Sequence, residues 1–461
     1  MTARKYLLLF LLAFLMALSV RVLTLQFMRA HLNDPSWFQS GSYKVFDRRA
    51  LSILDGSEGL FRINDPSRTD LVQYPPAFPW WVATIYRVTG EHSAYAVQNV
   101  QWVIDLFLTL VLATGIAVTA YGWRCGVVTS FLVALSPLLA MYGVSPTADA
   151  PTTWVVLGGL WCLLLAAKRD SLAWSIASGA LLGIACWLRV NPLYLSFFLA
   201  VALLLFWNKA WPRKLKLASS VVAVTLLVVS PIVIRNYLAF PDFTPTGGTL
   251  GTNLWEGLGE TELGKQHGFR LGDHLMLERE RLKMGIPADA RFEIMWPDGI
   301  RRENERRRES VEFIQQHPVW YAGVMLHRMW GMLKIAGAPS PFYGSAGINV
   351  TSKKTLPPER HGGLLSLLVN LLGIVQSVTR YALLPLAAIG MFLGARQQRL
   401  MTAVLLATIF YYLVPGSAAH TEIRYVLPVH GLLPAFASLA LSSAWDLIFR
   451  RRSSRLATAV L

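Results

Sequence analysis

The chain has 461 residues, of which 54% are hydrophobic and only 15% are charged. A soluble protein carries about 45–50% apolar and about 25% charged residues, so these charges are too few to cover a soluble protein of this size. The same numbers exclude disordered and disulfide-rich chains and predict an all-α protein with several membrane spans. The net charge of +16 is better explained by basic cytoplasmic loops, which membrane proteins commonly have, than by binding of nucleic acid.

Ten apolar segments approach the roughly 20 residues that a membrane-spanning helix needs. The first follows a basic start, and we interpret it as an uncleaved anchor with a cytoplasmic N-terminus. In chain order the expected spans are 6–27, 98–119, 126–142, 151–167, 172–188, 191–207, 216–235, 364–394, 400–415 and 424–447.

The short basic loops all fall on the cytoplasmic side in this arrangement, as the positive-inside rule requires. The outer loop 28–97 contains two short amphipathic stretches, Val45–Leu54 and Phe78–Val88, which are typical of interfacial helices. In the segment 256–312, the run Arg301–Glu312 mixes charges as an exposed, ion-paired helix does. The amphipathic stretch Val319–Ile335, with Arg328 and Lys334, is expected on the outer surface.

These patterns divide the chain into three parts. Residues 1–255 form an N-terminal transmembrane catalytic module that includes the outer loop 28–97. Residues 256–363 form an outer, periplasmic or lumenal segment with an amphipathic helix. Residues 364–461 form C-terminal transmembrane helices and a basic cytoplasmic tail.

Polar residues gather at the outer ends of the predicted helices, where their cost in a membrane makes them informative. They are Asp47, Asp149, Arg189, Arg235 with Asn236, and the group His420, Glu422, Arg424 and Tyr425. Their convergence predicts one outer-face site. Asp105, inside the second span, is expected to hydrogen-bond Gln101 or Trp102.

Such a site suits a lipid phosphate and a hydroxyl acceptor. Arginine binds phosphate through two parallel hydrogen bonds, and a carboxylate can accept the proton of a hydroxyl group. Together these groups favour attack on an anomeric carbon with a lipid phosphate leaving. A transporter or a ligase that binds undecaprenyl phosphate would show the same groups, so the residues alone leave these alternatives open.

The order of motifs resembles the GT-C membrane glycosyltransferases, in the branch of the dolichyl-phosphate-mannose protein mannosyltransferases and the aminoarabinose transferases. Seven motifs carry the resemblance, and they follow the family's order over most of the chain. They are Phe46–Ala50 with Leu54–Gly56, Tyr74–Trp81, Thr147–Pro151, Gly183–Arg189, Ser230–Tyr237, Gly247–Gly257 and His420–Pro428.

The resemblance implies a GT-C-like bundle, a polyprenyl-phosphate-linked sugar donor, inverting transfer on the outer leaflet and a general base in the first loop. The family's acidic residue about five positions before Asp47 is absent, because Gly41–Lys44 stands there. Asp47 is therefore the first candidate for the base, and Asp149 is the second. Asp55, Asp65 and Asp70 remain open as other candidates for the base. Asp47 could instead form an ion pair with Arg48 or Arg189, and the chain could be a family member without catalytic activity.

By resemblance, Arg424 and Tyr425 are the first candidates for contacts with the donor phosphate, followed by Arg189 and Arg235. The candidates for contacts with the rest of the substrates are Tyr74, Trp80, Asn253, His420 and Glu422. An ion pair of Arg424 with Glu422 is the alternative for that arginine. No metal or other cofactor is expected.

The expected function is glycosyl transfer from a polyprenyl-phosphate sugar to a glycan, lipid or protein acceptor, with no nucleic acid involved. A flippase for lipid-linked sugars and a catalytically silent GT-C-like partner are the alternatives. The expected location is the bacterial inner membrane, or the endoplasmic reticulum membrane of a eukaryote. Both termini would be cytoplasmic and the active site periplasmic or lumenal.

Overall fold

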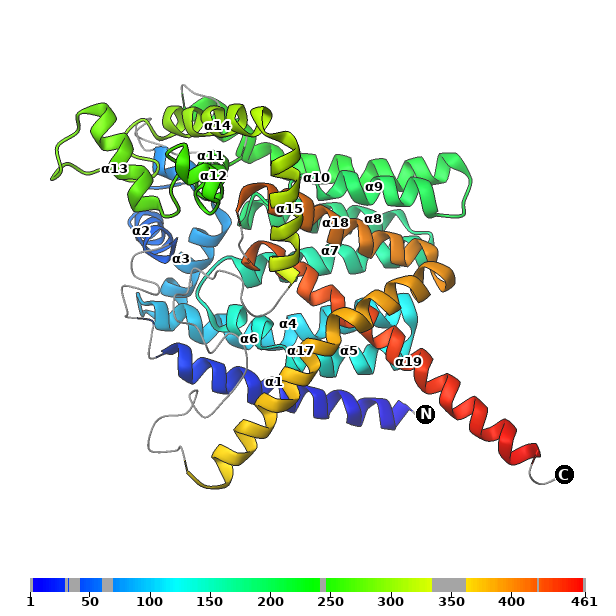
Figure 1. Ribbon diagram of the computed structural model, residues 1–461. Helices are drawn as coiled ribbons and strands as arrows, with labels where there is room; N and C mark the ends of the chain where they lie inside the picture. Colours follow the sequence, from blue (N-terminus) through cyan, green and yellow to red (C-terminus); the bar gives the residue numbers. More distant parts are fainter. Residues whose placement is uncertain are drawn as a thin grey trace.

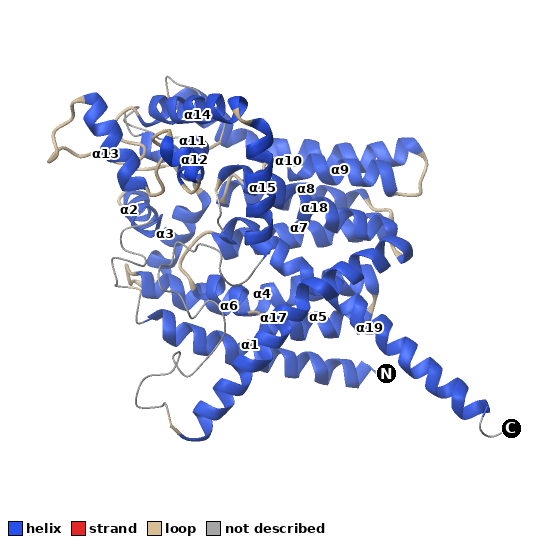
Figure 2. Cartoon of the chain, in the orientation of Figure 1, coloured by secondary structure: helices blue, strands red, loops and turns tan. Residues whose placement is uncertain are grey.

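A computed structural model describes residues 3–29, 32, 42–59, 69–240, 246–333, 362–420 and 423–458. Helices account for the regular structure of these ranges, and none of their residues is assigned to a strand (Figure 2). The α-helices are α1 (Ala3–Arg29), α2 (Ser42–Leu54), α3 (Ala77–Thr89), α4 (Ala94–Tyr121), α5 (Trp123–Leu135), α6 (Pro137–Val144), α7 (Asp149–Arg169), α8 (Leu172–Leu188), α9 (Leu195–Phe206), α10 (Trp211–Ala239), α11 (Leu250–Gly259), α12 (Glu262–Gln266), α13 (Asp273–Met284), α14 (Gly299–Gln316), α15 (Pro318–Leu333), α17 (Gly363–Gln397), α18 (Arg399–Ala419) and α19 (Leu427–Thr458). Two 3₁₀ helices are η2 (Thr69–Val72) and η5 (Ile423–Val426).

Each of the ten predicted spans is helical, but not all are long enough to cross a membrane alone. Seven of the described helices are long and apolar enough, which makes this an integral membrane protein. The predicted span 126–142 is a pair, α5 and α6, bent by 63°. The break falls at Ser136–Pro137, since Pro137 offers no N–H to continue the helix and Ser136 caps α6 instead. The other two, α8 and α9, are 17 and 12 residues long.

The centre of the bundle is α7, which packs against α4, α8 and α19. Its residues Leu157, Leu160 and Leu163 are fully buried in the largest hydrophobic cluster. Helix α8 in turn packs closely on α10, because a Cβ at Gly183 would lie 2.5 Å from Val228 Cβ. This glycine belongs to the Gly183–Arg189 motif, so the motif serves helix packing at one end and presents Arg189 at the other.

Helices α2, α3 and α11–α14 gather at the end of the bundle that lies away from both termini (Figure 1). The two interfacial stretches predicted at 45–54 and 78–88 are α2 and α3, which pack on each other. The arrangement places the loops that carry the candidate residues at this one end.

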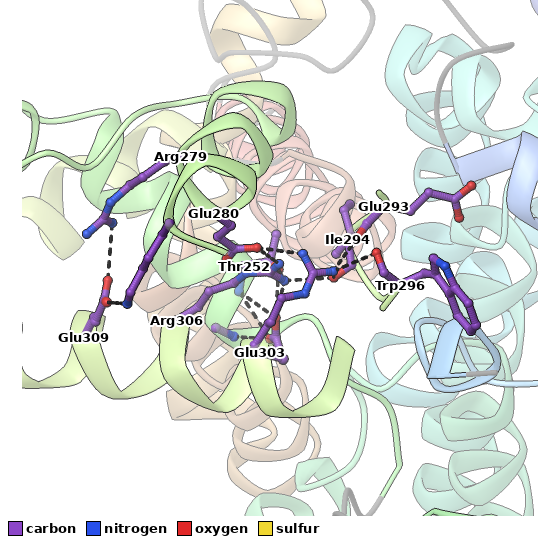
Figure 3. A network of polar contacts seen from close by, with 12 residues as sticks. Thr252, Arg279, Glu280, Glu293, Ile294, Trp296, Glu303, Arg306 and Glu309 are labelled. Atoms are coloured by element: carbon purple, nitrogen blue, oxygen red, sulfur yellow. Dashed lines mark hydrogen bonds and ion pairs between the residues drawn. The ribbon is translucent and has the colours of Figure 1, made fainter. Parts of the chain in front are cut away.

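The segment 256–363 differs from the prediction in two places. The predicted helix Arg301–Glu312 is α14, but one face of it is buried: Arg302, Glu303 and Arg306 are 2%, 7% and 3% exposed. Arg302 and Arg306 both form ion pairs with Glu280 of α13, which offset the cost of burying their charges. Figure 3 shows the pair of Arg306 with Glu280. The predicted surface helix 319–335 is α15, which packs on α18 with Arg328 buried, while Lys334 lies outside the described residues.

Asp105 forms a buried ion pair within the membrane bundle. Its carboxylate lies 2.8 Å from Arg21 Nε, and the two side chains are 2% and 0% exposed. Thr109 and Trp154 also donate to it, whereas Gln101 donates to backbone carbonyls of the α6–α7 loop. The expected bonds of Asp105 to Gln101 or Trp102 are therefore wrong, because α1 supplies a cation that the local sequence cannot reveal.

Asp105→Asn should destabilise the fold by about 3–5 kcal/mol, since it leaves the Arg21 charge buried without its partner. Thermal unfolding in detergent would measure the loss. Arg124→Gln is the matched control, because its pair with Asp446 is also short, at 2.6 Å, but the side chains are 58% and 46% exposed. Exposed pairs contribute about 0–1 kcal/mol. Equal unfolding temperatures for the two variants would contradict this account.

Candidate functional site

Six of the predicted site residues lie together around Tyr425 of η5. We call this group the Tyr425 cluster: Asp149, Arg189, Asn253, His420, Arg424 and Tyr425. The guanidinium carbons of Arg189 and Arg424 each lie 5.5 Å from the centre of the Tyr425 ring. The Tyr425 hydroxyl lies 3.5 Å from Asn253 Oδ1 and 3.4 Å from His420 Nε2. The structure thus joins groups from four separate parts of the chain.

Asp149 and Arg189 meet because α7 and α8 are adjacent and antiparallel. Asp149 lies in the first turn of α7 and Arg189 is the residue that ends α8. An acid at a helix N-terminus and a base at a helix C-terminus both complement the helix dipole. Their side chains form an ion pair and are only 1% and 16% exposed. The pair fixes the position of the Arg189 guanidinium beside Tyr425.

Two residues that were not predicted as site residues complete the surroundings of His420. His420 Nδ1 lies 3.6 Å from Glu260 Oε1, and Glu260 Oε2 lies 3.2 Å from Arg328 Nε. Glu260 follows directly after α11, and Arg328 comes from α15. One signal was available for Arg328: it is a charged residue within a helix that is otherwise largely apolar.

Asp47 lies on α2, and its described partner is a tyrosine, not one of the arginines that the sequence suggested. It accepts a hydrogen bond of 2.5 Å from the Tyr86 hydroxyl, which also contacts the Tyr43 hydroxyl at 2.7 Å. Burial and the hydrogen bond to Asp47 raise the pKa of Tyr86 far above its usual range, so it stays protonated and donates. The pairings of Asp47 with Arg48 or Arg189 do not form, since these arginines bind Glu293 and Asp149.

Neighbours of Asp47 and of the Tyr425 cluster share one hydrophobic core. Phe46, Ala148 and Ile423 are buried in the same hydrophobic cluster, and Leu188 packs against it. Each is adjacent in sequence to a candidate polar residue. The core therefore holds α2, the α7–α8 pair and η5 at the same end of the bundle.

Arg235 does not contact the Tyr425 cluster. It is 4% exposed, and its guanidinium donates to Asn236 Oδ1. Its charge faces Arg49 and Glu58, which form their own ion pair at 2.7 Å. Arg235 thus belongs to a second basic group beneath α2.

The remaining candidates lie apart from the Tyr425 cluster or outside the described residues. The Tyr74 ring packs on Phe46 with 4.9 Å between the ring centres, and Trp80 is 41% exposed on α3. Asp55 accepts a hydrogen bond from the backbone N–H of Ser57. The candidates Asp65 and Glu422 and the side chain of Asp70 lie outside the described residues.

Comparison with known proteins gives a family match for part of the chain. Residues 73–234 match the sequence model of the dolichyl-phosphate-mannose-protein mannosyltransferase family. This range runs from α3 to α10 and includes the Asp149–Arg189 pair. No curated protein matches the chain.

Solved structures with the same fold include the archaeal oligosaccharyltransferase AglB from Archaeoglobus fulgidus. Its complex with an inhibitory peptide and a dolichol-phosphate is 14% identical over 98% of this chain and 52% of that chain, with a TM-score of 0.54. Its apo form is 14% identical over 99% and 52%, with a TM-score of 0.53. The chain therefore spans about half the length of this protein. ArnT from Cupriavidus metallidurans bound to undecaprenyl phosphate is 15% identical over 96% and 79%, with a TM-score of only 0.39.

AglB shares the arrangement of the helices, and the family match adds the sequence pattern of residues 73–234. The family match agrees with the mannosyltransferase branch that the ordered motifs indicated. The chain thus shares the fold of AglB, and its residues 73–234 match the dolichyl-phosphate-mannose-protein mannosyltransferase family.

Proposed function

We propose that this chain transfers a sugar from a polyprenyl-phosphate donor to a hydroxyl-bearing acceptor, with inversion at the anomeric carbon. The family match and the shared fold support the reaction class. The observation that carries the proposal is that two guanidinium groups, those of Arg189 and Arg424, each lie 5.5 Å from the centre of the Tyr425 ring. AglB, which has the same fold, was solved with a dolichol-phosphate.

The Tyr425 cluster is suited to the leaving phosphate. Its two arginines outnumber its one carboxylate, so the group carries a net positive charge before His420 is counted. Guanidinium groups match the geometry of phosphate oxygens. Negative charge develops on the phosphate as the sugar leaves, and fixed cations there stabilise the transition state more than the ground state.

Asp47 is the better of the two candidates for the general base. The Asp149 carboxylate is 1% exposed and held by Arg189, so we assign it the role of positioning that arginine. Asp47 is partly exposed, and its described partner is the hydroxyl of Tyr86. The Tyr86 hydroxyl is a neutral group, so this contact does not hold Asp47 in an ion pair as Arg189 holds Asp149.

In the proposed reaction, Asp47 accepts the proton of the acceptor hydroxyl. The oxygen attacks C1 of the sugar while the bond from C1 to the phosphate oxygen breaks. The bonding electrons pass to the phosphate, which leaves on the polyprenyl chain beside Arg189 and Arg424. We further propose that both termini are cytoplasmic, that this end of the bundle faces the periplasm or lumen, and that residues 256–363 form a separate outer segment.

Sugar-labelled donors of several chemistries, supplied to the protein in nanodiscs with cell-envelope acceptors, test the proposal. The expected result is label on an acceptor, joined with the opposite anomeric configuration to that of the donor. A transporter would instead move intact donor across a liposome bilayer, and label that stays on the lipid would contradict the transferase.

A further inference from the structure

Helix α11 connects the outer segment with the Tyr425 cluster, and both its ends are held by buried charges. At its N-terminus, Glu303 accepts hydrogen bonds from the backbone N–H groups of Gly251 and Thr252 and from Thr252 Oγ1. Arg306 contacts both Glu303 and Glu280 (Figure 3). A carboxylate is favourable there, since it meets the positive end of the helix dipole.

The C-terminal end of α11 is held by Arg328. Its Nη2 donates to the Gly257 carbonyl at 2.5 Å, and its Nε lies 3.2 Å from Glu260 Oε2. The last four carbonyls of a helix have no partner within the helix, so a cation at this end satisfies an acceptor and complements the dipole. Arg328 is only 2% exposed.

The same guanidinium also holds the end of α18. Arg328 Nη1 donates to the carbonyls of Ser417 and Ala419 at 3.0 and 3.1 Å, in the last turn of that helix. The two helix ends touch, since a Cβ at Gly257 would overlap the carbonyl oxygen of Ala419. One side chain of α15 therefore ties the C-terminal ends of α11 and α18 together.

The same two helices carry the partners of the Tyr425 hydroxyl. Asn253 lies in the first turn of α11, and His420 is the first residue after α18. We propose that Arg328 is a positioning residue that sets the Tyr425 cluster by fixing both helix ends at once. The proposal rests on the proposed function for its effect on turnover, but not for its effect on structure.

Lysine cannot replace this arrangement. Arg328 contacts three carbonyls, the Glu260 carboxylate and the Tyr321 hydroxyl through three different nitrogens of a planar fork. A lysine ammonium is a single point with three donors. Arg328→Lys therefore keeps the charge and loses the link between the two helices.

Amide hydrogen exchange tests the structural part directly. In Arg328→Lys, exchange should accelerate together in peptides that cover 250–260 and 414–420, and remain unchanged in the 299–316 peptides of α14. Arg308→Lys is the matched control, because Arg308 lies on α14 with a side chain that is 70% exposed. Unchanged exchange at either helix end would overturn the proposal.

Turnover tests the positioning role. A small misplacement of reacting groups costs about 100-fold in rate, so kcat of Arg328→Lys should fall between about 10-fold and 100-fold. In a Tyr425→Phe background, the same substitution should cost less than about threefold, since coupled residues are not additive. Additive losses would mean that Arg328 acts elsewhere.

The outcomes separate the two proposals. Full activity of Arg328→Lys, with an active wild type, would contradict the positioning role and leave the transferase intact. A wild type that transfers no sugar, while exchange changes as expected, would contradict the transferase alone and leave the link between α11 and α18.

Discussion

Asp47→Asn should lower the rate of sugar transfer by about 10²–10⁴-fold, the range that general bases contribute. The amide that replaces the carboxylate cannot accept the acceptor's proton. It can still accept the hydrogen bond from Tyr86, so the fold and the binding of the donor should be little affected. Turnover would be followed as polyprenyl phosphate formed, and donor binding by native mass spectrometry of the same nanodiscs.

Two further carboxylates serve as comparisons for that variant. Asp55→Asn should retain activity, because Asp55 is exposed and hydrogen-bonded within its own turn. Asp149→Asn should weaken donor binding as well as turnover, since it releases Arg189. If Asp47→Asn stays active and Asp149→Asn alone loses the chemical step, the two roles are exchanged.

Arg189→Gln should weaken the binding of the donor by roughly 10- to 100-fold, because a hydrogen bond to a charged group contributes about 1.5–3 kcal/mol. Two effects act in the same direction. The variant removes one of the two cations at Tyr425, and it leaves Asp149 as an uncompensated carboxylate near the phosphate. A titration with polyprenyl phosphate would give the dissociation constant.

The double variant Asp149→Asn/Arg189→Gln separates the two effects. It removes the pair without leaving a charge behind, so it should bind the donor better than Arg189→Gln alone. Wild-type affinity in Arg189→Gln would show that the phosphate binds elsewhere, and the group of Arg49 and Arg235 would be the next place to test.

Much of the fold could be predicted because apolar runs of spanning length have few other uses in a chain. Where the predicted helix boundaries differ from the structure, the cause is a turn or break in the local chain. At 126–142 the apolar run is continuous, yet Pro137 breaks the helix into two. Helix α8 has the predicted bounds, 172–188, whereas α9 begins at Leu195, four residues after the predicted start at 191.

The site could be predicted only in part, because its residues come together through helix packing. The resemblance assigned Asp149, Arg189 and Tyr425 to one site. The antiparallel packing of α7 and α8 explains how Asp149 and Arg189 meet. Arg235 carries an equally good motif, but the end of α10 faces Arg49 and Glu58. Neither composition nor spacing reveals that direction.

Ion pairs between residues far apart in the sequence could not be predicted either, because they too depend on how the helices pack. Arg302 and Arg306 look like solvated residues until Glu280 of α13, more than twenty positions away, is seen beside them. From the sequence Arg328 resembles a surface cation, whereas in the structure it donates hydrogen bonds to carbonyls at the ends of two helices, α11 and α18. In each case a buried charge is tolerated because its partners surround it.

The most direct test of the central claim measures both products of a single incubation. Purified protein in nanodiscs would receive a panel of polyprenyl-phosphate sugars with envelope acceptors, and the free polyprenyl phosphate and the transferred sugar would be counted. We expect one lipid phosphate released for each sugar transferred, and neither product from Asp47→Asn. Donor that binds but yields no lipid phosphate, with any acceptor, would contradict the claim and favour a transporter or a catalytically silent partner.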